Sequence, residues 1–286
     1  MTCAALPLGG PEMQEPNDIK RLALIIDALD RNTFAGILLD LLAGHVSFDS
    51  ALIVTYRPTS RPHVVLDRLN APNNQKRLPR YVAGAYLLDP FYNFALQIRE
   101  PALVRLKDIA PGDFQNSDYF ITYYKTSNVT DEINYLIPDG RGSVVAISLE
   151  RVQPHHSYSE AELETLSELQ VLVTALVGKH AQLMPGQAEQ QNAVIDAEHT
   201  RLKSKLARFG TSRLTQREHE VLRYLISGQD TNDIADEIGI SRETVRVHRR
   251  NIYRKLDVTS IGGLFSLALK GLLAHGSDDC DPLLLV

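Results

Sequence analysis

The chain has 286 residues and a formal net charge of −5, with 44% hydrophobic and 23% charged residues. This length suits two domains better than one, and the composition is typical of globular protein, which excludes a disordered or fibrous chain. The apolar runs are far shorter than the roughly 18 residues of a bilayer-spanning helix, so we expect no membrane partner. The first residues lack the basic start and apolar middle of a secretory signal, which predicts a cytoplasmic location.

Helical spacing is clear in two segments of the first part of the chain. Residues 17–43 repeat leucine and isoleucine at intervals of three and four, which predicts two core-forming helices with a break at 32–33. Residues 159–180 predict a long helix. Ser159 and Glu162 have the spacing of a capping box at its start.

Between these helices the pattern indicates strands. Residues 51–56 and 63–69 are rich in valine, leucine and tyrosine and are separated by a segment with two prolines, which predicts a β-hairpin. Residues 132–137 and 143–149 flank a Pro-Asp-Gly-Arg-Gly turn and predict a second hairpin. This mixed α/β pattern over residues 17–183 resembles GAF- and PAS-like sensor sandwiches, so we expect a ligand-sensing or regulatory domain.

A connector follows, with a change in charge. Residues 184–208 begin with proline, glycine and a glutamine-rich run and are predicted to be a linker, in which 193–209 resume a helical pattern. From residue 201 onward the chain has 14 Lys+Arg and 11 Asp+Glu, whereas the first 200 residues have 16 and 24. Residues 209–274 are therefore predicted to be a separate, more basic domain.

The basic domain begins with two predicted helices joined by a short turn. Thr215 and Glu218 form a capping box for the first helix, and Gly228 follows its end. The second helix begins at residue 231 or 232, and Gly239 supplies the turn after it.

Ser241 caps a third helix that has two unlike faces. One face is predicted to pack on the first two helices and contains Val245, His248, Ile252 and Leu256. The opposite face is basic and contains Arg246, Val247, Arg249, Arg250 and Arg254. Such a helix suits the DNA major groove, because arginine can bind guanine edges or phosphates and a small apolar side chain can contact a thymine methyl group.

This segment resembles the LuxR-type, or NarL/FixJ-type, helix-turn-helix. The positions that match its pattern are Leu214, Thr215, Arg217, Glu218, Val221, Leu222, Gly228, Ile234, Ala235, Ser241, Thr244, Val245, His248, Ile252, Lys255 and Leu256. By that resemblance Arg246, Val247 and Arg250 read bases. Ser241, Thr244, His248, Arg249 and Lys255 fall at or near phosphate-contacting positions.

The resemblance also implies a fourth helix on which family members dimerise, and residues 264–273 match it. Residues 259–263, Thr-Ser-Ile-Gly-Gly, depart from the arginine-containing turn that the family usually has there, and the two glycines weaken the first helical turn. The whole chain is thus expected to have an α+β fold with a C-terminal all-α four-helix domain.

The resemblance identifies the chain as a member of a family of transcriptional regulators. We expect sequence-specific binding to double-stranded promoter DNA as a homodimer, under the control of a signal at the N-terminal domain. RNA polymerase and a small-molecule effector are further expected partners. No cofactor is expected.

A more specific alternative is an acyl-homoserine-lactone receptor of the LuxR type. Residues 81–95 resemble the Tyr and Asp-Pro region of these receptors, in which the aspartate holds the amide of the ligand. The candidate pocket residues are Tyr81, Tyr86, Asp89, Tyr119 and Tyr123. The receptors also use tryptophans in the pocket, and this chain has none. The structural alternative is that Asp89 caps a helix whose first residue is Pro90.

An enzyme fused to a DNA-binding tail is the third hypothesis. The sequence has no nucleophile elbow, no zinc-protease motif and no glycine-rich phosphate loop, so we expect no enzyme. His155 and His156 are adjacent and point in divergent directions, so no metal site is assigned to them.

Overall fold

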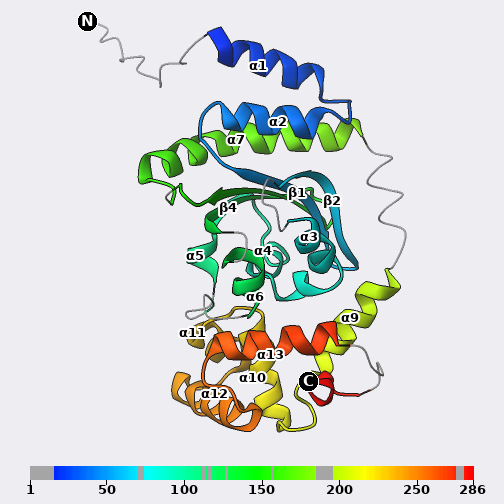
Figure 1. Cartoon of the computed structure of the whole chain (residues 1–286), viewed down its shortest axis with the longest axis vertical. Helices are drawn as coiled ribbons and strands as arrows, with labels where there is room; N and C mark the ends of the chain where they lie inside the picture. The colour runs from blue at the N-terminus through cyan, green and yellow to red at the C-terminus, as the bar shows by residue number, and fades with distance from the viewer. Residues whose placement is uncertain are drawn as a thin grey trace, which may run out of the picture.

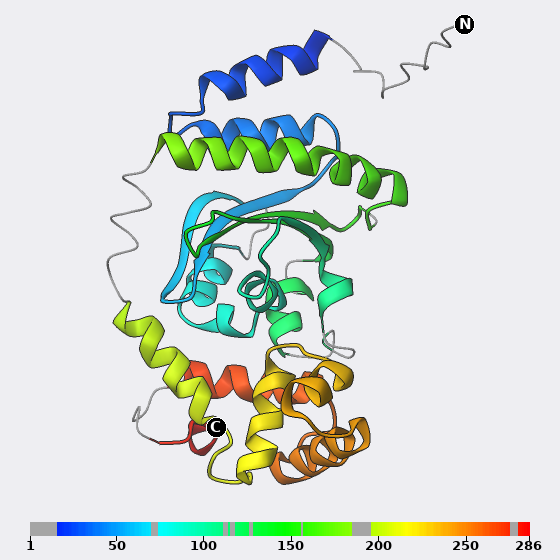
Figure 2. The same ribbon diagram turned by 180° about the vertical axis from the view of Figure 1, so that it is seen from behind.

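The computed structural model of the chain describes residues 16–69, 74–110, 114, 118–125, 128–155, 157–184, 196–274 and 280–286. Figures 1 and 2 show a sheet with helices on both faces and, at one end of the long axis, a bundle of helices. The sheet and its helices are called the N-terminal part below, and the bundle is called the helix bundle. The predicted α+β fold class is confirmed.

The sheet has five antiparallel strands in the order β2-β1-β5-β4-β3. The strands are β1 (Ser50–Arg57), β2 (Ser60–Arg68), β3 (Ala102–Arg105), β4 (Val129–Pro138) and β5 (Val144–Val152). Both predicted hairpins are confirmed, as β1–β2 and β4–β5. The sequence did not predict β3, because its four residues are too few for an alternating pattern and form a strand only by pairing with β4 at the sheet edge.

Helices α1 (Pro16–Asp27), α2 (Phe34–Ala43) and α7 (Glu160–Leu183) lie on one face of the sheet (Figure 1). Because neighbouring residues of a strand point to opposite faces, Ile53 and its partner Ile147 are buried in the core shared with α2 and α7. The break between the first two predicted helices and the long third helix are confirmed.

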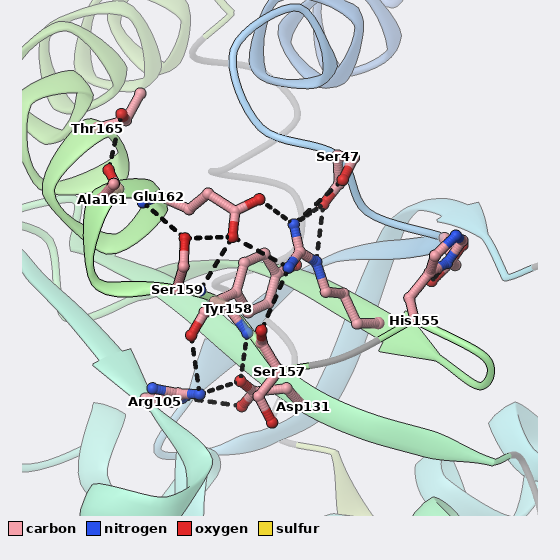
Figure 3. A network of polar contacts seen from close by, with 12 residues as sticks. Ser47, Arg105, Asp131, His155, Ser157, Tyr158, Ser159, Ala161, Glu162 and Thr165 are labelled. Atoms are coloured by element: carbon pink, nitrogen blue, oxygen red, sulfur yellow. Dashed lines mark hydrogen bonds and ion pairs between the residues drawn. The ribbon is translucent and has the colours of Figure 1, made fainter.

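The start of α7 is tied to the sheet by a network of charged side chains (Figure 3). Glu162 accepts a hydrogen bond from the Ser159 amide at 2.9 Å and completes the predicted capping box. Its carboxylate also forms an ion pair with Arg151 of β5. Nearby, Asp131 of β4 forms an ion pair with Arg105 and accepts a hydrogen bond from the Tyr158 amide at 3.0 Å. The connection between β5 and α7 is therefore held through Arg151 at its start and through Tyr158 at its end.

Short helices cover the opposite face of the sheet. They are α3 (Asn74–Val82), η1 (Ala85–Leu88), α4 (Pro90–Ala95), α5 (Leu106–Ile109), α6 (Asp118–Phe120) and η3 (Ile121–Lys125). Asp89 caps α4 by accepting the Phe91 amide at 2.9 Å, and Pro90 is the first residue of the helix. This confirms the structural interpretation of Asp89, since a proline in the first helical position loses no hydrogen bond.

The helix bundle contains α9 (Ala197–Arg208), α10 (Gln216–Ile226), α11 (Thr231–Ile238), α12 (Arg242–Leu256), α13 (Ile261–Leu273) and the short η4 (Pro282–Leu285). The predicted capping box of Thr215 and Glu218 is present at α10. Gly239 has a φ of 65°, the left-handed conformation of a helix end that glycine adopts without strain. The three-helix core of the bundle therefore has the caps and turns expected from the sequence.

The fourth helix of the bundle begins three residues earlier than predicted. Ser260 accepts the Gly263 amide at 3.0 Å and caps α13 at Ile261. Burial of Ile261 and Leu264 offsets the cost of two glycines in the first turn. Within the described residues no single helix is long and apolar enough to cross a membrane; α12 and α13 meet that test only together, bent by 52°.

The two parts of the molecule share an extensive contact. Helix α13 packs on α6 and η1, and α9 packs on β2. The ring of Phe265 lies 5.6 Å from that of Phe114, and the Tyr86 hydroxyl lies 2.6 Å from His199 Nδ1. Leu202 of α9 approaches Gly84 so closely that a Cβ there would meet it at 3.2 Å. A single apolar core therefore continues from the second face of the sheet into the bundle.

The last residues of the chain are part of the bundle. Asp281 accepts hydrogen bonds from the Gly210 amide at 2.8 Å and from the Ser212 amide at 2.7 Å. It also caps η4 through the Leu283 amide at 2.9 Å. Leu283 is buried, and Pro282 packs on Gly271 of α13. These contacts fix the connection between α9 and α10.

Lys205 is buried in α9 and its ammonium donates to the carbonyls of Leu272 and Ala274, at 3.3 and 2.6 Å, at the end of α13. Lys205→Met keeps the apolar stem but leaves buried carbonyls without this donor, so we expect the free energy of unfolding to fall by about 1–3 kcal/mol. Urea unfolding followed by circular dichroism measures the change. Lys179→Met, on the exposed side of α7, is the matched control and should have no effect.

Candidate functional sites

Helix α12 has a buried side and an exposed side. Its start is fixed by Ser241, whose hydroxyl accepts the Thr244 amide at 3.0 Å. Val245, Ile252 and Leu256 are buried against α10 and α11, as predicted. His248 lies on the same side, half-buried, and its Nδ1 has no hydrogen-bond partner among the described residues.

The other side of α12 is basic and open to solvent. Arg246 and Arg250 are exposed, and Val247 between them is 37% exposed. Arg246 pairs with Glu243 at 3.2 Å, but both side chains are well exposed, and such pairs contribute little free energy. Arg246 can therefore exchange this partner for a nucleic acid. The three predicted base-reading residues lie together on one accessible surface.

The helix that carries this surface lies far from the sheet. In both views α12 lies at the end of the long axis that is farthest from the sheet (Figures 1 and 2). Among elements of the bundle it is α13 and α9, not α12, that contact the sheet and its short helices extensively. Arg246 and Arg250 of α12 are therefore exposed in the docked arrangement, and a major groove about 12 Å wide is of a size to accept such a helix.

The predicted phosphate contacts gather at the start and along the flank of α12. The hydroxyls of Ser241 and Thr244 lie 2.8 Å apart at the helix N-terminus, where backbone amides and the helix dipole favour a phosphate. Arg249 donates from Nε to the Tyr253 hydroxyl at 2.9 Å, and its guanidinium carbon lies 5.3 Å from the centroid of that ring. These contacts orient the Arg249 guanidinium.

Lys255 differs from the other predicted phosphate contacts because it has a carboxylate partner. Its ammonium donates to Glu218 at 2.6 Å, and Glu218 also accepts the Thr215 amide at 2.9 Å. Burial alone would raise the pKa of Glu218, but the hydrogen bonds from Lys255 and Thr215 lower it to about 2. The ion pair joins α10 to α12, so a phosphate at Lys255 would have to share the ammonium with Glu218.

Three of the five predicted pocket residues line one cavity, and that cavity is small. Tyr81, Asp89 and Tyr119 line a cavity of about 40 Å³ between the sheet and the short helices. The Tyr81 hydroxyl donates to Asp89 at 2.6 Å and lies 2.8 Å from the Tyr56 hydroxyl. Burial raises the pKa of Asp89 to about 6, against the opposing effect of the hydrogen bond from Tyr81.

Charged side chains fill much of the space beside this cavity. Arg77 forms an ion pair with Glu150, and both are largely buried. Glu132 accepts from Ser148 at 2.5 Å and from Asn134 at 3.0 Å through Oε1, while its buried Oε2 has no partner among the described residues. Burial and the neighbouring carboxylate of Glu150 raise the pKa of Glu132 to about 8. The cavity is therefore polar as well as small.

The other two predicted pocket residues, Tyr86 and Tyr123, differ in what the structure describes of them. Tyr86 points toward the helix bundle, where its hydroxyl contacts His199 at 2.6 Å and its ring lies 5.0 Å from that of Tyr92. The side chain of Tyr123 lies outside the described residues. Tyr86 and Asp89 are near neighbours in sequence, but the 3₁₀ turn of η1 directs the two side chains to different sites.

Comparison with known proteins identifies the family. Residues 212–268 match the family described as bacterial regulatory proteins, luxR family. Over 190 residues the chain is 32% identical to an HTH-type transcriptional regulator of the exeN 3' region of Aeromonas salmonicida, covering 65% of this chain and 95% of that relative. The chain belongs to the luxR family. This luxR-family protein is a DNA-binding transcriptional regulator with an N-terminal sensor domain.

Two further similarities extend over the sensor domain of the luxR-family chain. It is 25% identical over 237 residues to the transcriptional activator protein CarR of Pectobacterium carotovorum subsp. carotovorum, which covers 82% of this chain and 89% of CarR. The solved LBD domain of VqsR from Pseudomonas aeruginosa is 26% identical, with a TM-score of 0.52, and the match covers 59% of this chain and 98% of that domain. The Aeromonas relative and CarR are both named as regulators of transcription.

Sequence reasoning missed the contact between Tyr86 and His199 and the ion pair between Glu218 and Lys255. The first joins residues 113 positions apart, and no periodicity connects them. The second could have been found, because both residues match the family pattern and both face the space between α10 and α12. A charged residue on the inner side of a helix is a signal for a buried partner.

The raised pKa of Glu132 predicts how stability depends on pH. In the unfolded chain the Glu132 carboxyl loses its proton near pH 4.5, whereas in the folded chain it keeps the proton up to about pH 8. The free energy of unfolding therefore falls as the pH rises from 4.5 to 8. Glu132→Gln removes this titration. We therefore expect the thermal unfolding midpoint of the wild-type chain to fall more between pH 6 and 8 than that of the variant. An equal fall in both would contradict the assignment, and Glu164→Gln, at an exposed site, is the control.

Proposed function

We propose that two copies of this regulator bind promoter DNA together, each placing α12 in the major groove of one half-site. Arg246, Val247 and Arg250 read base edges. The phosphate contacts are Ser241, Thr244, His248, Arg249 and Lys255. The observation that carries the proposal is the exposure of the basic side of α12, including Arg246, Val247 and Arg250.

A dimer is proposed because one small DNA-reading module buries too little surface for tight specific binding, and helix-turn-helix proteins therefore bind half-sites about one helical turn apart. In the family that the sequence resembles, the helix equivalent to α13 forms the dimer. Here α13 packs on α6 and η1, and Leu264, Phe265 and Ala268 are buried. Dimerisation through α13 would require the N-terminal part to move away.

The proposed control follows from this contact. A signal that changes how the N-terminal part docks on the bundle changes the fraction of chains that can dimerise, and the apparent affinity for DNA falls with that fraction. The division into a regulatory domain (17–183), a linker (184–208) and a DNA-binding domain (209–274) belongs to the same proposal. Helix α9 of the bundle falls within the proposed linker and packs both on β2 and on α13.

The remaining parts of the proposal concern partners and location. A small molecule is the proposed effector, and RNA polymerase is the proposed target of the DNA-bound dimer. The cytoplasm is the proposed location, because a chromosomal promoter is accessible there. We propose no enzymatic activity.

An acyl-homoserine lactone is not favoured as the effector, because small-molecule sites typically have volumes of roughly 300–1,000 Å³ and the cavity beside Asp89 has about 40 Å³.

Substitutions on α12 test the DNA interface. Arg246→Ala or Arg250→Ala should cost about 1–3 kcal/mol in promoter binding and relax base preference, whereas Arg249→Ala should weaken binding to all sequences alike. Fluorescence anisotropy at fixed salt, with duplexes selected from random DNA, gives these affinities. Arg141→Ala, on the exposed β4–β5 turn, should leave them unchanged. Unaltered affinity in all three α12 variants would show that another surface binds DNA.

A substitution between the two parts tests the control. Leu202→Ala removes a buried contact with the N-terminal part at Gly84 and should weaken docking by about 2 kcal/mol or more. We expect the affinity for a duplex with two half-sites to rise about tenfold or more, and the dimer fraction in sedimentation to rise with it. Affinity and dimer fraction equal to those of the wild-type chain would contradict control by docking.

A further inference from the structure

A second and much larger cavity lies where the N-terminal part meets the helix bundle. Its volume is about 650 Å³, within the roughly 300–1,000 Å³ of small-molecule sites. Its wall combines the β1–β2 turn, α4, α9 and α10, which contribute among others Pro58, Tyr92, Lys203 and Leu222. It is distinct from the cavity of about 40 Å³ beside Asp89.

The lining of this cavity has an apolar zone and a basic zone. Phe209, Leu222 and Ile226 are buried side chains in its wall. Lys203 and Arg223 also line it and are exposed, so they lie at its mouth. None of the described residues that line it is an aspartate or a glutamate. The charge in the lining therefore favours an anion, and the apolar wall favours a hydrocarbon body.

One buried polar group in the wall has no partner. Tyr92 is 2% exposed, and its hydroxyl makes no hydrogen bond with any described residue. A buried hydroxyl without a partner costs free energy. Because this hydroxyl is inaccessible, Tyr92 lines the cavity with its other atoms and adds no polar group to the lining.

His199 forms part of the same wall but is already engaged on both ring nitrogens. Nδ1 lies 2.6 Å from the Tyr86 hydroxyl and Nε2 lies 2.9 Å from the Pro58 carbonyl. Burial lowers its pKa, so the ring is neutral and adds no charge to the site. The ring fixes α9 against the β1–β2 turn and defines the edge of the cavity.

We propose that this cavity binds an amphipathic carboxylate, with its hydrocarbon body against Phe209, Leu222 and Ile226 and its charged head near Lys203 and Arg223. Because the wall belongs to both parts of the molecule, the bound carboxylate holds them together. This identification of the effector class rests on the proposed control by docking.

Isothermal titration of the full chain with decanoate tests the site. We expect saturable binding of one decanoate per chain. 1-Decanol, which has the same tail without the charge, should bind at least tenfold more weakly, and decyltrimethylammonium should not bind. Uptake of all three without saturation, or with equal affinity, would overturn the proposal, because it would indicate nonspecific association of the tail.

Variants locate the binding. Lys203→Gln and Arg223→Gln should each weaken decanoate binding several-fold and together at least tenfold, without changing the affinity for 1-decanol. Lys179→Gln, a cation on the exposed side of α7, is the matched control. Wild-type decanoate affinity in the double variant would overturn the proposal.

A last measurement separates this proposal from the function on which it rests. Titration of decanoate with and without saturating duplex should show that each ligand weakens the other by the same factor, as linkage requires. Decanoate binding that is unaffected by duplex would leave the site intact and contradict control by docking. Normal DNA binding by a chain that takes up no decanoate would contradict the site alone.

Discussion

The apolar core that crosses from the sheet into the helix bundle is the constraint on which the rest of the structure depends. Phe114 and Phe265 meet in it, and Leu202 closes against Gly84. Burial of apolar surface has no preferred direction, so it holds the two parts together without selecting one orientation between them. The polar contacts at its edge, such as Tyr86 with His199, then select one orientation.

This orientation assigns different roles to neighbouring helices of the bundle. Helix α13 is covered by α6 and η1, whereas α12 turns its arginines to solvent. The side chains proposed to read DNA are thus accessible in the docked arrangement, while the helix predicted to pair two copies is not. The control that we propose therefore acts on assembly of the dimer and not on access to the groove, and the proposed ligand between the parts acts on the same equilibrium.

The sequence predicted the features that depend on near neighbours in the chain. Thr215 and Glu218 signal a helix start three residues apart, and Val245, Ile252 and Leu256 share one side of a helix by their spacing alone. The contacts that form the cavity of about 650 Å³ between the N-terminal part and the helix bundle could not be predicted. Tyr92 and Lys203 belong to segments separated by more than a hundred positions, and only the packing of α9 on the sheet brings them to one wall.

The hydrogen bonds of Asp281 bear on how the DNA-binding half can be isolated. A fragment ending at Leu273, where the helical pattern stops, would lose the carboxylate that the amides of Gly210 and Ser212 contact. It would also uncover the surface of α13 on which Pro282 lies. Any excised version meant to bind operator DNA by itself should therefore retain the C-terminal tail through Val286.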